Sequence, residues 1–181
     1  MSEKTEKIII IGASGSGKDF LMRKLVERGL TPCLKCTTRP MRKFEQQGIT
    51  YDFIEEKSFT QLITENKFLT HQSFEVTPEN SNPETWYYGI TLEEFNNKQV
   101  LIMTPGEFSN LPSELRKGCF VVYLDIARDI REKRLHYRED KNDSVKRRLD
   151  ADEKDFKISI DYDLKITDPD FGADDVYDLM N

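Results

Sequence analysis

The chain has 181 residues, of which 37% are hydrophobic and 33% are charged, and its formal net charge is −6. This length and composition predict one α/β domain with a substantial core. A net negative charge argues against a general nucleic-acid coat, no apolar run reaches membrane length, and no secretion signal precedes the first strand, so we expect a cytoplasmic protein.

The most informative stretch lies between a predicted buried strand at 7–11 and a predicted helix at 17–28. It consists of Gly12, Ala13, Ser14, Gly15, Ser16, Gly17, Lys18 and Asp19. A strand, a glycine turn and a helix N-terminus in this order can hold a phosphate chain, because backbone N–H groups approach the phosphate without a Cβ in the way. The helix dipole adds partial positive charge and Lys18 adds a full charge. The alternative is a glycine turn with a chance lysine, which the flanking elements disfavour.

Asp19 departs from the usual pattern of such a loop. Ser or Thr normally stands there and its hydroxyl ligates magnesium. A carboxylate is also a hard ligand for Mg²⁺, directly or through water, so Asp19 is our candidate metal ligand. The alternative is that Asp19 only caps the helix, where an anion is favoured in any case.

Two arginines follow the next predicted strand, at 31–36. Arg39 and Arg42 lie three residues apart around a proline, so both guanidinium groups can converge on one anion. The alternative is a solvated surface pair. A helix is predicted over 58–66, with Ser58 as its cap and Phe59 on its apolar face.

The remaining elements are predicted from apolar runs and their punctuation. The polar, proline-containing stretch 75–86 is predicted to be a loop. We expect strands at 99–103, 119–124 and 162–167, and helices at 128–137, 149–156 and 174–180.

Several of these motifs, in this order, resemble guanylate kinase. The motifs are the loop 12–19, Thr37-Thr38-Arg39 with Arg42, Gly48 followed by Tyr51 and Phe53, Tyr87-Tyr88-Gly89, 134–138 and 145–149. The resemblance implies an α/β P-loop kinase fold, with a mainly parallel sheet flanked by helices, a small inserted nucleotide-monophosphate-binding region and a helical lid. It also implies a single domain over 1–181, with a core of 1–34, 98–133 and 150–181, an acceptor-binding region at about 35–97 and a lid at about 134–149.

The same resemblance implies the roles of individual residues. ATP with Mg²⁺ would bind residues 12–19. The phosphate of an acceptor nucleoside monophosphate would bind Arg39, Arg42, Tyr51 and Tyr88. Lys18, Arg138 and Arg148 would act on the transferring phosphoryl group, with Arg147 as the alternative to Arg148. Arg134 is either a further phosphate contact or a surface charge.

The base pocket departs from the family pattern. Thr70 stands where the family has a Glu that recognises guanine, and Ile90 stands where it has Ser or Thr. GMP or dGMP is therefore the default acceptor, and another deoxynucleoside monophosphate, modified or unmodified, is its rival. Glu75 or Glu79 is a candidate for the missing carboxylate, against the alternative of a solvated loop charge.

The predicted strand 99–103 ends without the expected acid and runs into Thr104. Together with Asp19, this is similar to ribose 1,5-bisphosphate phosphokinase, a relative of guanylate kinase. The alternatives are thus a kinase of a phosphorylated sugar, a kinase of a modified base in DNA, and a non-catalytic interaction module. Of these, only the kinase of a base in DNA would have nucleic acid as a partner. Lys18 and the complete set of loop glycines disfavour the module. The sequence leaves the oligomeric state open.

Overall fold

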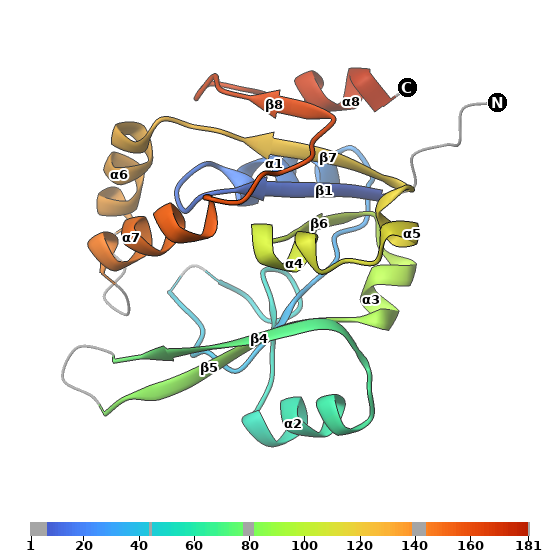
Figure 1. Cartoon of the computed structure of the whole chain (residues 1–181), viewed down its shortest axis with the longest axis vertical. Coiled ribbons are helices and arrows are strands. Elements are labelled where there is room, and N and C mark those ends of the chain that lie inside the picture. The colour runs from blue at the N-terminus through green and yellow to red at the C-terminus, as the bar shows by residue number, and fades with distance from the viewer. Residues whose placement is uncertain (1–6, 44, 78–81, 139–143, 181) are drawn as a thin grey trace. The chain divides into compact units, whose positions relative to one another are not determined.

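The computed structural model describes residues 7–43, 45–77, 82–138 and 144–180, and of Leu179 and Met180 only the backbone. The chain forms two compact units, which Figure 1 shows in ribbon form. One unit contains residues 1–32 and 99–181, and the other contains residues 33–98. Glu79 and the lid residues 139–143 lie outside the described part of the chain.

The first unit is built on a parallel sheet with the strand order β6-β1-β7-β8. Its strands are β1 (Lys7–Gly12), β6 (Val100–Ile102), β7 (Cys119–Leu124) and β8 (Leu164–Ile166). The four isoleucines 8–11 are completely buried. An unbroken apolar run, in place of alternation, is what a parallel strand covered on both faces requires.

Six helices of this unit are described: α1 (Lys18–Glu27), α4 (Pro105–Ser109), α5 (Ser113–Arg116), α6 (Arg128–Tyr137), α7 (Val145–Asp155) and α8 (Asp174–Met180). Leu21 and Leu25 of α1 are completely buried and pack with Ile8 and Ile10 of β1. Helix α1 begins directly after Gly17 and is followed by Gly29, both at positive φ. The apolar face of α1 therefore fixes the loop before it against the end of β1.

The second unit contains a mixed sheet with the strand order β3-β2-β5-β4. Its elements are β2 (Cys36–Thr37), β3 (Asp52–Phe53), α2 (Glu56–Thr64), β4 (Phe68–Val76), β5 (Glu84–Thr91) and α3 (Leu92–Asn97). Phe59 of α2 is completely buried, with its ring centroid 4.5 Å from that of Phe68 and 5.4 Å from that of Tyr87. These ring contacts hold α2 on one face of the β4–β5 hairpin.

Three predicted elements differ from the structure. The strand expected at 31–36 is confined to β2, which begins only at Cys36. Helix α2 begins at Glu56 with Glu55 as its N-cap, so Ser58 lies inside the first turn and is not the cap. The predicted loop 75–86 is wrong at both ends, because Glu75 and Val76 belong to β4 and 84–86 belong to β5.

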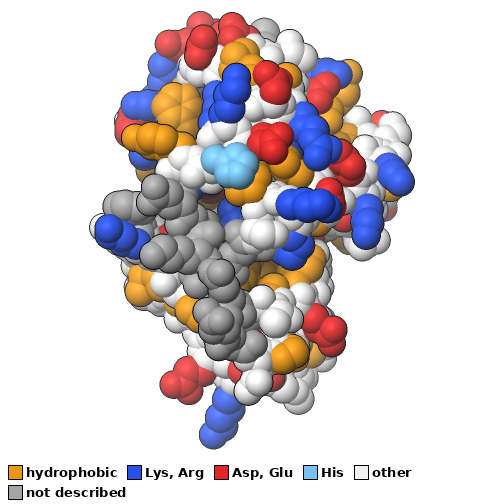
Figure 2. Space-filling view, turned by 90° about the vertical axis from the view of Figure 1, so that its left-hand side faces the viewer, with side chains coloured by type: hydrophobic (Ala, Val, Ile, Leu, Met, Phe, Trp, Pro, Cys, Tyr) orange, Lys and Arg blue, Asp and Glu red, His pale blue; other side chains and the backbone are white. Residues whose placement is uncertain are grey.

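The surface of the first unit over α6 and α7 carries interspersed acidic and basic side chains, as Figure 2 shows. Several of them form pairs, among them Lys146 with Asp150 and Arg128 with Glu153. Alternating signs are typical of a solvated helix face. Within the described ranges, no helix is long and apolar enough to cross a membrane.

Candidate active site

The loop between β1 and α1 adopts a conformation that depends on its glycines. A Cβ on Gly12 would lie 2.5 Å from the Ser16 hydroxyl oxygen. Gly15 has φ +78°, and a Cβ there would lie 2.7 Å from the carbonyl oxygen of Arg131. Gly17 has φ +103°. Larger residues would therefore clash at Gly12 and Gly15 and would be strained at Gly17.

Three cations hold the carbonyl groups of this loop. Lys18 Nζ donates to Ala13 O (3.0 Å), Arg131 Nη1 to Ser14 O (3.3 Å), and Arg134 Nη1 to Gly15 O (3.2 Å) and Ser16 O (3.3 Å). The C=O and N–H of a planar trans peptide point in opposite directions. The N–H groups of Gly15 and Gly17 therefore point away from the arginines that bind the preceding carbonyls, as an anion-binding loop requires.

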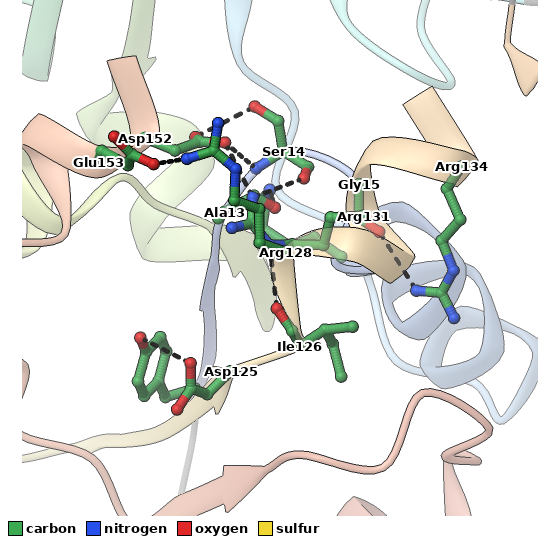
Figure 3. A network of polar contacts seen from close by, with 12 residues as sticks. Ala13, Ser14, Gly15, Asp125, Ile126, Arg128, Arg131, Arg134, Asp152 and Glu153 are labelled. Carbon is green, nitrogen blue, oxygen red and sulfur yellow. Dashed lines mark hydrogen bonds and ion pairs between the residues drawn. The ribbon is translucent and has the colours of Figure 1, made fainter. Parts of the chain in front are cut away.

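A carboxylate of α7 holds the same loop from another side, as Figure 3 shows. Ser14 donates its backbone N–H to Asp152 Oδ2 (3.0 Å) and its hydroxyl to Asp152 Oδ1 (3.1 Å). Arg131 donates to Asp152 Oδ2 (3.3 Å) and, through Nε, to Ile126 O (3.0 Å). The side chains of Arg131 and Asp152 are only 12% and 13% exposed. Ser14, Arg131 and Asp152 thus form one largely buried clamp.

Sequence reasoning missed Arg131 and Asp152 and gave Arg134 a different role. The structure makes Arg134 a support of the loop, bound to its carbonyls and to Pro169 O (2.7 Å). A signal was present, since Asp152 follows the buried Leu149 by three residues and Arg131 precedes Arg134 by three. That spacing places each pair on one helix face.

The metal candidate Asp19 lies exposed in the first turn of α1. Among the described residues, no group of three or more His, Cys, Asp or Glu side chains converges. The Ser16 hydroxyl is completely buried and has no hydrogen-bond partner among these residues. A single carboxylate beside a lysine and an anion loop fits a Mg²⁺ ion that arrives with phosphates and keeps water ligands.

A pocket of about 660 Å³ adjoins the loop in the first unit. Its lining includes Gly15, Gly17, Phe20, Arg134, Tyr137, Arg138 and Phe171. The predicted Arg138 thus lies with the loop glycines at one pocket. Arg148 is half-buried on α7, four residues before Asp152, and so shares the helix face that contacts Ser14. Arg147, its alternative, is exposed.

The second unit buries an arginine together with its counter-ion. Arg39 is 3% exposed and donates to both carboxylate oxygens of Glu45 (2.8 and 2.7 Å) and to Pro40 O (2.8 Å). Burial is the largest single effect on Arg39 and opposes its charge, but the hydrogen bonds and charge of Glu45, together with Tyr88 and Tyr51, outweigh it and raise the pKa of Arg39. Burial likewise acts to raise the pKa of Glu45, and the hydrogen bonds from Arg39 and Arg42 lower it overall. A solvated surface pair is therefore the wrong description of Arg39.

The other predicted acceptor residues surround this pair. Arg42 Nη1 lies 4.0 Å from Glu45 Oε1. The guanidinium of Arg39 lies 5.2 Å from the Tyr51 ring centroid, and the Tyr51 and Tyr88 centroids are 6.2 Å apart. Burial raises the pKa of Tyr88, against the opposing effect of Arg39 and Arg42. Arg39, Arg42, Tyr51 and Tyr88 thus form one cluster.

Glu45 completes the cluster and was missed by sequence reasoning. It accepts the backbone N–H of Arg42 (2.8 Å) as well as the guanidinium of Arg39. A signal existed in the spacing, because Arg39, Arg42 and Glu45 follow one another at intervals of three residues.

Thr70 lies on the sheet face that carries Tyr88. In the β4–β5 ladder Thr70 pairs with Ile90 and Gln72 pairs with Tyr88. Paired residues share a face and neighbouring residues along a strand alternate, so Glu75 points to the opposite face from Thr70. Glu75 is therefore not the substitute carboxylate on this face, and Glu79, the other candidate, lies outside the described residues.

The end of β6 carries a helix cap. Thr104 is the N-cap of α4, where its hydroxyl accepts the Glu107 N–H (3.2 Å) and Glu107 Oε2 accepts the Thr104 N–H (2.7 Å). Glu107 is 3% exposed. The Glu107 carboxylate, the first one after β6, is therefore used as a helix cap.

Comparison with known proteins agrees with this arrangement. The guanylate kinase family profile matches residues 4–179. Guanylate kinase of Nostoc sp. is 27% identical over 175 residues, covering 92% of this chain and 83% of its own, and that of Vibrio cholerae is 28% identical over 174 residues, covering 90% and 80%. The crystal structure of guanylate kinase from Anaplasma phagocytophilum superposes with a TM-score of 0.60 at 18% identity, over 98% of this chain and 86% of that one. The α/β arrangement is that of a P-loop kinase, and the chain belongs to the guanylate kinase family.

Proposed function

We propose that the chain is an ATP-dependent nucleoside monophosphate kinase, which transfers the terminal phosphoryl group of ATP to the phosphate of a nucleoside monophosphate. The observation that carries this proposal is the loop 12–18, in which every carbonyl from Ala13 to Ser16 is bound by a cation and Lys18 is retained. A non-catalytic interaction module would have no need of this arrangement. Membership in the guanylate kinase family supports the same activity.

On the donor side, residues 12–19 would bind the phosphate chain of ATP. Phosphoryl transfer asks for positioning and positive charge more than for covalent chemistry. Lys18, Arg138 and Arg148 would supply that charge, and the helix face shared by Arg148 and Asp152 supports Arg148 over Arg147. Asp19 would hold Mg²⁺ directly or through water, and the ion would neutralise charge on the phosphate oxygens.

On the acceptor side, Arg39, Arg42, Tyr51 and Tyr88 would bind the monophosphate. Arg39 keeps its positive charge because Glu45 accompanies it into the interior. The acceptor phosphate is already an anion at neutral pH, so the reaction needs no general base. His71 and His136 are accordingly given no catalytic role, and both are exposed.

For the base, GMP or dGMP is the default, and another deoxynucleoside monophosphate is the rival. The sheet face around Tyr88 supports keeping the rival, because Thr70 and its partner Ile90 carry no charge. Two adjacent guanine donors, N1–H and N2–H₂, are best matched by a carboxylate, and Thr70 lacks one.

The test is coupled ADP release with a panel of acceptors. The panel contains GMP, dGMP, the other ribo- and deoxynucleoside monophosphates, hydroxymethylated dUMP and ribose 1,5-bisphosphate. We expect turnover with at least one nucleoside monophosphate and a loss of about 100-fold or more in Lys18→Met, because the loop lysine acts directly on the phosphates. Lys24→Met is the matched control, since Lys24 lies on the same helix in an exposed pair with Glu27.

The outcomes separate the alternatives. Turnover of ribose 1,5-bisphosphate alone would identify a sugar-phosphate kinase. ATP binding without turnover of any free acceptor would point to a larger acceptor, such as a base in DNA. No thermal stabilisation by ATP would contradict the kinase and favour an interaction module.

A further inference from the structure

The acid on α7 is the part of the loop's surroundings that the proposed function does not use. Asp152 holds the loop at Ser14, whose backbone N–H and hydroxyl donate to its two oxygens at 3.0 and 3.1 Å. Ser14 precedes the N–H groups of Gly15 and Gly17, which face away from the arginines. The Asp152 carboxylate therefore binds the donors of Ser14 and leaves the N–H groups of Gly15 and Gly17 available to an anion.

The charge of Asp152 is balanced inside the same cluster. Arg131 donates through Nη1 to both Asp152 and Ser14 O, and its Nε donates to Ile126 O, two residues after the end of β7. Both side chains are nearly nine-tenths buried, at 13% and 12% exposed. A carboxylate held this way cannot turn into solvent without leaving a buried arginine unpaired, which is costly.

The donors and the acceptor of Ser14 are thus bound by different partners. Its N–H and hydroxyl go to Asp152, and its C=O goes to Arg131. Fixing both peptide planes that flank Ser14 fixes the direction of the Gly15 N–H that follows. A flexible glycine-rich loop would otherwise lose conformational entropy when it closes on a phosphate chain.

We propose that Asp152 is a positioning residue of the phosphate loop, which holds the loop in its phosphate-binding form, through Ser14 and Arg131, before the nucleotide arrives. This inference rests on the proposed function in one respect only, that the loop binds the phosphates of ATP. Affinity for the phosphate chain then depends on a carboxylate that does not touch it.

The variants differ in which contacts they keep. Asp152→Ala removes both acceptors and the partner of Arg131. Asp152→Asn removes the charge but can keep all three contacts, because its amide oxygen can accept from the Ser14 N–H and from Arg131 while its NH₂ donates to the Ser14 hydroxyl. Ser14→Ala removes only the hydroxyl contact. Asp150→Ala is the matched control, since Asp150 lies on the same helix, is 44% exposed and pairs with Lys146.

The first measurement is the dissociation constant of MgATP and of magnesium tripolyphosphate by calorimetry. We expect Asp152→Ala to weaken both by about tenfold, since a charge-assisted hydrogen-bond pair is lost from the preorganised loop. Asp152→Asn and Asp150→Ala are expected to stay within about threefold of the wild type. The double variant Ser14→Ala/Asp152→Ala should lose no more affinity than Asp152→Ala alone, because the contact that Ser14→Ala removes, the hydroxyl bond to Asp152, is already absent in Asp152→Ala.

The second measurement is hydrogen exchange of the segment 12–19 without nucleotide. It should be faster in Asp152→Ala and unchanged in Asp150→Ala, which would support the clamp whatever the loop binds. Equal or tighter ATP binding by a folded Asp152→Ala, or an equal loss in Asp150→Ala, would overturn the inference. If Asp152→Ala does not fold, the MgATP dissociation constants of Asp152→Asn and Ser14→Ala are compared with that of the wild type. A loss of affinity of less than about twofold in Ser14→Ala would then overturn the inference. Failure of the wild type itself to bind ATP would instead refute the proposed function.

Discussion

Arg39 shows how a single residue can be both buried and charged. An unpaired guanidinium at 3% exposure would carry a large desolvation cost, and a bidentate carboxylate offsets it. The ring faces of Tyr51 and Phe53, at 5.2 and 5.5 Å, attract the same cation. If Arg39 binds the acceptor phosphate as proposed, Glu45 would act on that site indirectly, by fixing the direction of the Arg39 guanidinium.

The Glu45 pair leads to a stability prediction with a defined pH dependence. We expect Glu45→Gln to lower the free energy of unfolding by about 3 kcal/mol at pH 7, because it leaves Arg39 buried without its counter-ion. The pKa of Glu45 lies below its usual value of 4.5, so the pair stabilises the fold above about pH 4.5 and is lost as the pH falls through the lowered pKa. Urea unfolding of wild type and variant at pH 7 and pH 3 measures both effects.

The control for this variant is Glu65→Gln, at an exposed residue that accepts a hydrogen bond from Gln61. Its unfolding free energy should change by less than about 0.5 kcal/mol. A difference between wild type and Glu45→Gln that is as large at pH 3 as at pH 7 would contradict the assignment.

Asp19 leads to a kinetic prediction. If it holds Mg²⁺ at the end of the loop, Asp19→Ser should bind ATP about as well as the wild type and turn over at least about tenfold more slowly, because the metal acts on the charge that develops during transfer. Calorimetric ATP affinity and steady-state turnover over a range of Mg²⁺ concentrations measure the two separately. The N-cap of α1 is Gly17, so Asp19 is not the cap that the sequence allowed, and an unchanged rate would mean that Asp19 only places a favourable negative charge in the first turn.

Residues with a fixed motif were predictable from the sequence, and their supports were not. The glycines and Lys18 follow a spacing that backbone sterics and charge explain, and Arg39 and Tyr88 followed from the order of the family motifs. Asp152 supports the loop from a helix more than 130 residues away, and only the tertiary structure brings it to Ser14. Glu45 is near Arg39 in the sequence, but their pairing depends on the conformation of the chain between them, which the sequence did not predict.

At the scale of the element, helix α2 ends in a well-defined stop. The N–H of Asn66 donates to Ile63 O and the N–H of Lys67 donates to Leu62 O, both at 3.0 Å. Asn66 itself has φ +53°. These are the two hydrogen bonds and the left-handed residue of a Schellman motif.

This geometry predicts that two substitutions at Asn66 change the stability differently. Asn66→Gly should stabilise the chain by a few tenths of a kcal/mol or leave it unchanged, because glycine adopts positive φ without strain. Asn66→Ala should lower the unfolding free energy by about 1 kcal/mol, because a Cβ without a polar group is strained there. Thermal and urea unfolding compare the two, and equal effects of Gly and Ala would contradict a left-handed stop.

The β4–β5 hairpin explains why one element prediction failed. The polar residues and prolines of 75–86 indicated a loop, but strand pairing extends as far as Val76 with Glu84. Phe74 pairs with Trp86, which is 5% exposed and donates its indole N–H to Glu84 (3.1 Å). Cross-strand contacts of this kind stabilise strands whose own composition does not favour them.

At the scale of the whole molecule, the two predicted ligand sites fall in different units. The phosphate loop and its clamp belong to residues 1–32 and 99–181, and the Arg39–Glu45 cluster belongs to residues 33–98. Among the described residues, α6 and α7 hold the loop within the first unit, and Glu45 holds Arg39 within the second. We therefore expect that ligand binding at one predicted site does not require ligand binding at the other.

This separation predicts two distinct footprints in hydrogen exchange. A ligand at about 100 times its dissociation constant stabilises the bound form by about 2.7 kcal/mol, which slows exchange in the segments that open only when it leaves by about 100-fold. MgADP should slow exchange in 12–19 and in α6 and α7, and the preferred acceptor should slow it in 36–53 and in β4–β5. Lys18→Met should abolish the first footprint and keep the second, because Lys18 lies in the loop and donates to the Ala13 carbonyl of the same loop. If MgADP protected 36–53 as strongly as 12–19 with no acceptor present, the two sites would not be independent, and nucleotide binding would have to be described as one coupled event of the whole chain.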